Sequence, residues 1–163
     1  MVKFLYAQVV VGGTFDYIHK GHECLLNASF NLGKRVIIGL SSDSFVADIG
    51  KHVDHNYDQR LNKLTSFLKE QHRLHRCKII KLEDRFGPAL HVASKAIVVS
   101  EETEVFANEC NLIRCAMGLC PLSKFVVSLV LAEDGERISS TKIRNREIDS
   151  RGRSLGRGHR GSH

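Results

Sequence analysis

The fold of this chain can be argued outward from one stretch, Val9-Val-Val-Gly-Gly-Thr-Phe-Asp-Tyr-Ile-His-Lys-Gly-His22. Its first three residues end an apolar segment that begins at Leu5, and this pattern predicts a buried strand over Leu5–Val11. The chain is then expected to turn at Gly12 and Gly13 and to enter a helix that ends at Gly33. A strand, a glycine turn and a helix N-terminus form an anion site, because free backbone amides and the helix dipole attract negative charge.

Two histidines flank the third glycine of this stretch. His19 and His22 lie three residues apart at the expected helix start, with Gly21 between them. Glycine lets the backbone approach a phosphate closely because it carries no Cβ. The stretch therefore predicts a phosphate site in which both imidazoles act as donors. Two surface histidines at a helix start are the plainer alternative.

Apolar runs alternate with helical periodicity along the rest of the chain. The patterns predict strands over 34–41, 78–82, 96–100 and 124–131, and helices over 42–47, 58–75 and 100–117, with a last helix opening near 138. Such alternation is typical of a parallel sheet with right-handed crossovers. The sequence therefore predicts an α/β protein with a doubly wound, Rossmann-like, five-stranded parallel sheet in a single domain over residues 1–150.

Composition and charge exclude several classes of protein. No apolar run approaches the roughly 18 residues of a membrane span, and the start of the chain lacks the layout of a signal peptide. We therefore expect a cytoplasmic protein without a membrane partner. The formal charge is +6, but four of the arginines lie in residues 151–163, which contain no acidic residue. That Arg/Gly-rich tail is expected to be disordered, and we expect no specific nucleic-acid partner. The sequence leaves the oligomeric state open, a monomer included.

The cysteines do not form a metal or disulfide pattern. There are five, an odd number, and no Cys-x-x-Cys pair occurs, so buried reduced thiols are the favoured interpretation. His72, His75 and Cys77 could imitate a metal site, but no fourth ligand is evident.

Two further places could contact phosphates. Lys51 follows the second predicted strand, at the edge where ligands bind in open α/β sheets; a solvated loop lysine is the alternative. Ser139-Ser140-Thr141 begins the last predicted helix, with Lys142 and Arg144 close behind. Taken alone these hydroxyls read as a helix cap, but they also suit a leaving pyrophosphate. In the helix over 58–75, Arg60 belongs to the basic side, which a solvated helix face explains better than a polyanion face.

Two motifs carry a resemblance to a known superfamily. Gly-Thr-Phe-Asp-x-x-His-x-Gly-His and Ile-Ser-Ser-Thr-x-Ile-Arg resemble the patterns of nucleotidylyltransferases with a His-x-Gly-His motif. Asp84–Ala89, Val98–Thr103 and Asn111–Arg114 further resemble phosphopantetheine adenylyltransferases of the archaeal and eukaryotic type. The resemblance runs from about Val9 to Arg146. Lys51 and Arg60 fall where that family has basic residues, and the departures, Tyr17-Ile18 and the tail, do not touch the chemistry.

The resemblance implies that ATP and 4′-phosphopantetheine are joined to give dephospho-coenzyme A and pyrophosphate. The acceptor phosphate would attack the α-phosphorus directly, so that positioning and charge stabilisation carry the catalysis. The implied catalytic residues are His22 at the α-phosphate, and Thr14 and Lys51 at the acceptor phosphate. Mg²⁺ would be bound mainly through substrate phosphates, because no dedicated carboxylate cage is visible.

The remaining implied site residues divide between the two substrates. Asp16 is assigned to the acceptor side, where orienting the turn is favoured over binding metal. The nucleotide side comprises Gly12, Gly13, Thr14, Phe15, His19, His22, Ser139, Ser140, Thr141 and Arg144, with Arg114 as a weaker candidate for the triphosphate.

Two rival functions stay open. The first is another adenylyl- or cytidylyltransferase of the superfamily, acting for example on nicotinamide mononucleotide or glycerol phosphate. The second, from a different class, is a non-catalytic nucleotide- or RNA-binding module that uses the basic tail.

Overall fold

The computed structural model describes residues 3–90, 94–128, 143 and 150–153. In chain order, these described residues form β1 (Tyr6–Gly13), α1 (Lys20–Leu32), β2 (Gly33–Ser41), α2 (Asp43–Asp48), α3 (Tyr57–Glu70), the 3₁₀ helix η1 (Leu74–Arg76), β3 (Cys77–Leu82), the 3₁₀ helix η2 (Gly87–Leu90), β4 (Ala96–Ser100), α4 (Glu104–Ala116) and β5 (Ser123–Val127).

The strands form one parallel sheet in the order β3-β2-β1-β4-β5. This confirms the predicted α/β class and the five-stranded doubly wound sheet. β4 has the predicted bounds, and β1 and β2 differ from the prediction by one or two residues at their ends. The last part of the predicted strand over 124–131 lies outside the described residues.

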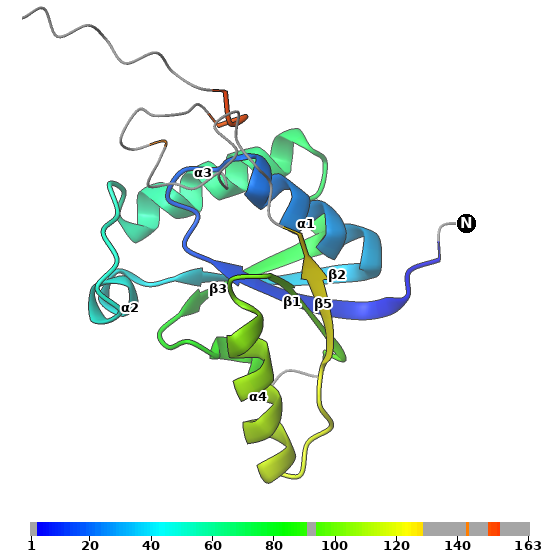
Figure 1. The fold of residues 1–163 in the computed structure, drawn as a ribbon. Coiled ribbons are helices and arrows are strands. Elements are labelled where there is room, and N and C mark those ends of the chain that lie inside the picture. The colour runs from blue at the N-terminus through cyan, green and yellow to red at the C-terminus, as the bar shows by residue number, and fades with distance from the viewer. Residues whose placement is uncertain (1–2, 91–93, 129–142, 144–149, 154–163) are drawn as a thin grey trace, which may run out of the picture.

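Each face of the sheet is covered by its own helices. Figure 1 shows α1 and α3 on one face and α4 on the other. Because successive strand residues point to opposite faces, Val9 and Val11 pack with α1 and α3, whereas Val10 packs with Cys110 of α4. This two-sided burial explains why the central strands read as continuous apolar runs rather than alternating ones.

The direction of winding reverses between β1 and β4. From β1 the chain adds β2 and β3 on one side, and it then returns to place β4 and β5 on the other. Within these described strands, the register joining β1 to β4 comprises two pairs, Val9–Ala96 and Val10–Ile97. In open α/β sheets the crevice at such a reversal, beyond the carboxyl ends of the strands, is where ligands bind.

Three expectations about the helices were wrong. α3 ends at Glu70 and not near residue 75, and His72 follows with a positive φ of 56°. Arg60 belongs to the buried stripe of α3, with 0% of its surface exposed, and not to a basic outer face. In α4, the helical spacing of Val105, Phe106, Cys110 and Ile113 predicts that all four face inward, but Val105 is 52% exposed. A helix period predicts a stripe but not which tertiary partner covers it.

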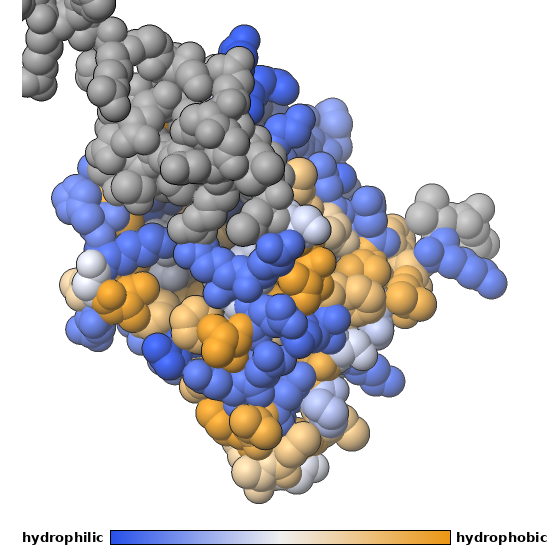
Figure 2. Space-filling view, viewed as in Figure 1, coloured by the Kyte–Doolittle hydropathy of each residue, from blue (hydrophilic) through white to orange (hydrophobic). Residues whose placement is uncertain are grey.

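On the face drawn in Figure 2, groups of apolar side chains alternate with hydrophilic ones. All five cysteines are free. Cys110 is buried as expected, Cys24 and Cys77 are half-buried, and the prediction of burial was wrong for Cys115 and Cys120, which are exposed. No helix in the described part of the chain has the length and apolar character that crossing a bilayer requires.

Candidate active site

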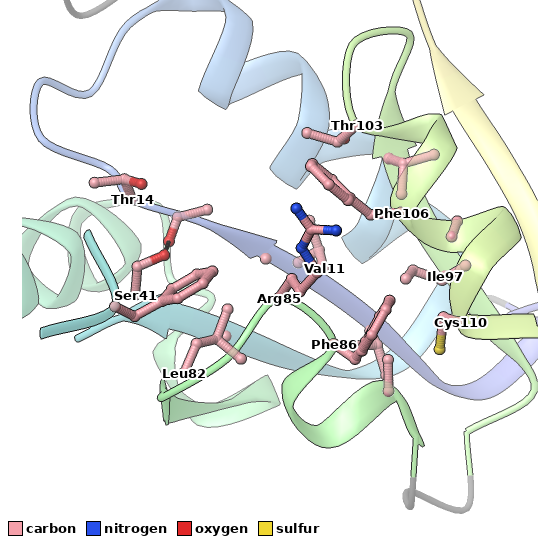
Figure 3. Close-up of a pocket in the computed structure, with 18 of the residues that line it drawn as sticks. Val11, Thr14, Ser41, Leu82, Arg85, Phe86, Ile97, Thr103, Phe106 and Cys110 are labelled. Atoms are coloured by element: carbon pink, nitrogen blue, oxygen red, sulfur yellow. Dashed lines mark hydrogen bonds between the residues drawn. The ribbon is translucent and has the colours of Figure 1, made fainter. Parts of the chain in front are cut away.

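A pocket opens at the reversal point between β1 and β4. Its volume is about 480 Å³, and its walls come from the carboxyl halves of β1, β2 and β4, from α2 and α4, and from the loop before η2. Figure 3 shows Thr14 and Ser41 toward one side and Ile97, Phe106 and Cys110 toward the other, with Arg85 between them. Most of the lining is apolar, and the polar groups of Thr14, Ser41 and Lys51 gather at one end. Such a pocket suits a ligand with an uncharged body and a charged head.

The turn after β1 begins at Thr14 and not at Gly12 as expected, because Gly12 and Gly13 still pair with β2 as the last residues of the strand, and this turn is held in a strained conformation. Phe15 has a φ of 51°, which bulky residues rarely adopt, and its side chain is 1% exposed. A Cβ at Gly13 would lie 2.8 Å from the Phe15 ring, so only glycine fits there. Strained backbone persists where the surrounding structure enforces it and is frequent at functional sites. The buried ring thus anchors the turn that presents Thr14 to the pocket.

His19 and His22 are joined in a capping box at the start of α1. The Nδ1 atom of His19 accepts hydrogen bonds from the backbone N–H groups of Gly21 and His22, at 3.1 and 3.4 Å. The Nδ1 atom of His22 accepts in return from the backbone N–H of His19 at 3.3 Å. The two rings stack with their centroids 3.8 Å apart. Because Nδ1 is an acceptor in both rings, the neutral tautomer of each carries its proton on Nε2.

The surroundings of His22 favour its neutral form. Burial, followed by the proximity of His19 and Lys51, holds the pKa of His22 well below its ordinary value. A neutral imidazole with Nδ1 occupied offers one donor, Nε2–H. The sequence prediction that the pair donates to a phosphate would thus involve a neutral imidazole at His22.

Gly21 is required by the position of the His19 ring. A Cβ added at Gly21 would lie 2.9 Å from Cε1 of that ring. The glycine between the histidines therefore permits His19 to fold over the N-terminus of α1. This differs from the sequence argument, in which the glycine made room for a phosphate.

Lys51 and Thr14 lie together at the polar end of the pocket. The ammonium of Lys51 is 3.4 Å from the hydroxyl of Thr14, to which it donates, and both residues line the pocket. The prediction that they share one site is thus consistent with their placement, although they are 37 residues apart in sequence. A hydroxyl and an ammonium side by side can both donate to a phosphate, so they form a suitable phosphate-binding site.

Asp16 orients the turn and the loop that follows Lys51. Its carboxylate is 2% exposed and accepts from the backbone N–H groups of Asp54 and His55, each at 3.1 Å. It also lies 2.9 Å from Nδ1 of His55. The described contacts therefore give Asp16 the orienting role that the sequence analysis favoured, and they direct its oxygens toward the protein.

Arg114 differs from the other predicted nucleotide-binding residues. It is 5% exposed, does not line the pocket, and donates to the carbonyl oxygens of Ala89 and Cys120, each at 2.9 Å. These bonds tie α4 to η2 and to the start of β5, which is a structural task. The other predicted nucleotide contacts, Ser139, Ser140, Thr141 and Arg144, lie outside the described residues.

Sequence reasoning missed two residues that shape this site. Arg60 is fully buried and binds three backbone carbonyls around the pocket. Its place one turn before Leu64 and two before Leu68, on the same buried stripe, was the available signal. Arg85 lines the pocket, with its guanidinium 4.9 Å from the Phe106 ring centre and 3.4 Å from the carboxylate of Glu109. It stood in a quoted loop, but nothing local distinguished it from a solvated arginine.

Comparisons with known proteins agree with this geometry. A family model described as cytidylyltransferase-like matches residues 10–146. A phosphopantetheine adenylyltransferase of Methanopyrus kandleri is 43% identical over 145 residues, 88% of this chain and 92% of the relative. One from Methanothermobacter thermautotrophicus is 40% identical, over 96% of this chain and 94% of the relative. A solved structure, a protein of unknown function from Archaeoglobus fulgidus, superposes with a TM-score of 0.68 at 27% identity, over 74% of this chain and 88% of that one.

Proposed function

Because this chain belongs to the phosphopantetheine adenylyltransferase family, within the cytidylyltransferase-like group, we propose that it transfers the adenylyl group of ATP to 4′-phosphopantetheine. The products are dephospho-coenzyme A and pyrophosphate, and the reaction belongs to coenzyme A biosynthesis. The observation that carries the proposal is the candidate phosphate-binding site formed by Lys51 and Thr14, 3.4 Å apart, at the end of a largely apolar pocket.

The acceptor matches the pocket in both of its parts. Its phosphate is assigned to Thr14, the amide of Phe15 and Lys51. Its uncharged arm is assigned to the apolar walls, which include Ile49, Val99 and Phe106. A volume of about 480 Å³ is in the range of sites for small molecules. Arg85 supplies N–H donors on this wall, where the amide carbonyls of the arm require partners.

The nucleotide is assigned to the start of α1. The Nε2–H groups of His19 and His22 would donate to phosphate oxygens, while the backbone at Gly12 and Gly13 allows close approach. Ser139, Ser140, Thr141 and Arg144 would hold the β- and γ-phosphates from the other side. One contact supports the assignment of residues 139–144 to the phosphates. The carbonyl of Ser150, six residues after Arg144, accepts from the backbone N–H of Lys20 at 2.9 Å, so the chain returns to the N-terminus of α1 at that point.

The chemistry requires no protein nucleophile. The acceptor phosphate attacks the α-phosphorus of ATP in line, and the bond to the β-phosphate oxygen breaks as the new bond forms. Negative charge grows on the α-phosphate oxygens, where the Nε2–H of His22 is proposed to donate. Lys51 lowers the repulsion between the attacking phosphate and the triphosphate. Fixed donors aimed at developing charge are an effective form of catalysis.

Mg²⁺ is proposed to enter with ATP. Within the described residues, no three His, Cys, Asp or Glu side chains cluster so as to hold a metal ion. The polar groups at the pocket end are the Lys51 ammonium and the hydroxyls of Thr14 and Ser41, all of which can donate to a phosphate, and no carboxylate from the described part of the chain lines the pocket. These residues fit an ion bound mainly through phosphate oxygens and water, as magnesium often is. When bound, it would supply charge neutralisation on the triphosphate.

The test is pyrophosphate release from ATP with each of three acceptors. 4′-Phosphopantetheine is compared with nicotinamide mononucleotide and glycerol phosphate, which stand for the rival transferases. We expect turnover with phosphopantetheine alone. Turnover with one of the other two would assign the chain to that rival. Absence of turnover with all three, together with ATP binding, would favour the non-catalytic alternative.

A further inference from the structure

Arg60 connects three segments that carry the proposed acceptor site. Its Nη1 donates to the carbonyl oxygens of Thr14 and Ser41, at 3.0 and 2.7 Å. Its Nε donates to the carbonyl of His55 at 3.0 Å. Thr14 follows β1, Ser41 ends β2, and His55 lies in the loop between α2 and α3, which also carries Lys51. One planar guanidinium therefore fixes these three backbones relative to one another.

The burial of this charge calls for a reason other than stability. The Arg60 side chain is 0% exposed, whereas its ionic partner, the carboxylate of Asp43 at 2.9 Å, is 55% exposed. Removing a guanidinium from water is costly, and buried ion pairs often add no net stability. The directions of its N–H groups are fixed, unlike those of a lysine ammonium. This makes arginine suited to holding carbonyls at set positions.

The same loop is held from its other side by Asp16. That carboxylate accepts the backbone N–H groups of Asp54 and His55, while Arg60 takes the His55 carbonyl. The path from Lys51 to His55 is thereby fixed at its far end, and Thr14 is fixed through its own carbonyl. These restraints act on the two segments that carry the Lys51 ammonium and the Thr14 hydroxyl, which lie 3.4 Å apart.

We propose that Arg60 is a positioning residue for the acceptor phosphate: it sets the placement of Thr14 against Lys51 and thereby the affinity for the acceptor, with little effect on ATP. This inference rests on the proposed function, because it assigns Thr14 and Lys51 to the acceptor. It predicts a selective loss, since the described hydrogen bonds of Arg60 go to the backbones of Thr14, Ser41 and His55 and to the carboxylate of Asp43, and none goes to the histidines of α1.

The experiment compares Arg60→Lys and Arg60→Met with a matched control, Leu68→Ala. Leu68 lies two turns further along the same stripe of α3, is 0% exposed, and does not line the pocket. Dissociation constants for 4′-phosphopantetheine and for ATP are measured by calorimetry, and KM values by pyrophosphate release. For both Arg60 variants we expect acceptor affinity to fall by about tenfold or more and ATP affinity to change by less than about threefold. The control should lose thermal stability with both affinities unchanged.

Three results would overturn this inference. One is wild-type acceptor affinity in Arg60→Lys, and another is an equal loss for ATP and acceptor. A third is the same acceptor loss in Leu68→Ala, which would mean that destabilisation alone explains the effect. Arg60→Lys keeps the charge and much of the bulk, so it serves if Arg60→Met does not fold. Wild-type protein that does not bind or adenylylate phosphopantetheine would refute the proposed function itself, whereas normal wild-type turnover with an unchanged Arg60→Lys would refute the positioning role alone.

Discussion

Replacing His22 by alanine separates its chemical role from its structural one. The chemical role proposed for it is that of a single donor, Nε2–H, directed at the charge that develops on the α-phosphate. Removing one such donor costs about 2.7–4 kcal/mol of transition-state stabilisation, or about 100- to 1,000-fold in kcat. The structural role is smaller, because His22 caps one backbone N–H of α1, that of His19 at 3.3 Å, and packs on the His19 and Phe15 rings at 3.8 and 4.8 Å.

The cost to stability can be estimated from the capping bond. Loss of a helix cap destabilises by about 1 kcal/mol. In a chain of this size that corresponds to about 2–4 °C in melting temperature. The two losses therefore differ enough to be measured in the same variant, kcat by pyrophosphate release and the melting temperature by calorimetry.

A second capping box in the protein supplies the control. The side chain of Gln59 accepts from the backbone N–H of Asn56 at 3.0 Å, as His22 does for His19, but at the start of α3. Gln59→Ala should lower the melting temperature by a similar amount and leave kcat within about twofold. If His22→Ala retained more than about a tenth of wild-type kcat, or if Gln59→Ala lost as much activity, His22 would not be the phosphate donor described here.

The remaining predictions concern the pH dependence of stability, the proposed binding site for the acceptor phosphate, the apolar pocket wall and the C-terminal tail. Because the pKa of His22 is lowered in the folded state, the unfolded chain binds more protons below about pH 6.5, and the stability of the fold should decrease as the pH drops through that range. The melting temperature of His22→Gln should therefore fall less steeply than that of the wild type between pH 7.5 and 5.5. Parallel curves for the two proteins would contradict the lowered pKa of His22. Lys51→Met should raise the KM for phosphopantetheine by roughly tenfold or more while Lys51→Arg retains part of the affinity, and a rise confined to the KM for ATP would place Lys51 with the wrong substrate. Ile49 lines the pocket but is 49% exposed, so Ile49→Glu should weaken acceptor binding by roughly tenfold with an unchanged melting temperature, and unchanged binding in a titration would remove that wall from the arm site. Deleting residues 154–163 should leave kcat and KM within about twofold, and a larger change in the same assay would show that the tail takes part.

The parts of the site that could be predicted from sequence depend on neighbours along the chain. The end of β1, the turn after it and the paired histidines lie within fourteen residues, so local backbone preferences could predict them, although the turn was expected at Gly12 and Gly13 and lies after these residues. Lys51 could be placed because the carboxyl ends of parallel strands share one edge of a sheet. The strand bounds followed from apolar runs that are buried on both faces.

What could not be predicted depends on tertiary partners. A periodic pattern gives arginine no place on a buried stripe, so Arg60 was assigned to the outside, although it meets carbonyls from three distant segments. The resemblance assigned Arg114 to the triphosphate, but its guanidinium donates to the carbonyl oxygens of Ala89 and Cys120. Similarly, the left-handed His72 ends the regular pattern after α3 without a glycine to signal it.

The short pairing between β1 and β4 divides the sheet into two blocks, β3-β2-β1 and β4-β5. Because the pocket takes its lining from both blocks, an occupant would bridge two parts whose mutual backbone cohesion is low. Acceptor binding should therefore slow amide hydrogen exchange in β4 and β5 and in the turn after β1. The acceptor would then hold the two blocks of the sheet together in addition to taking part in the reaction.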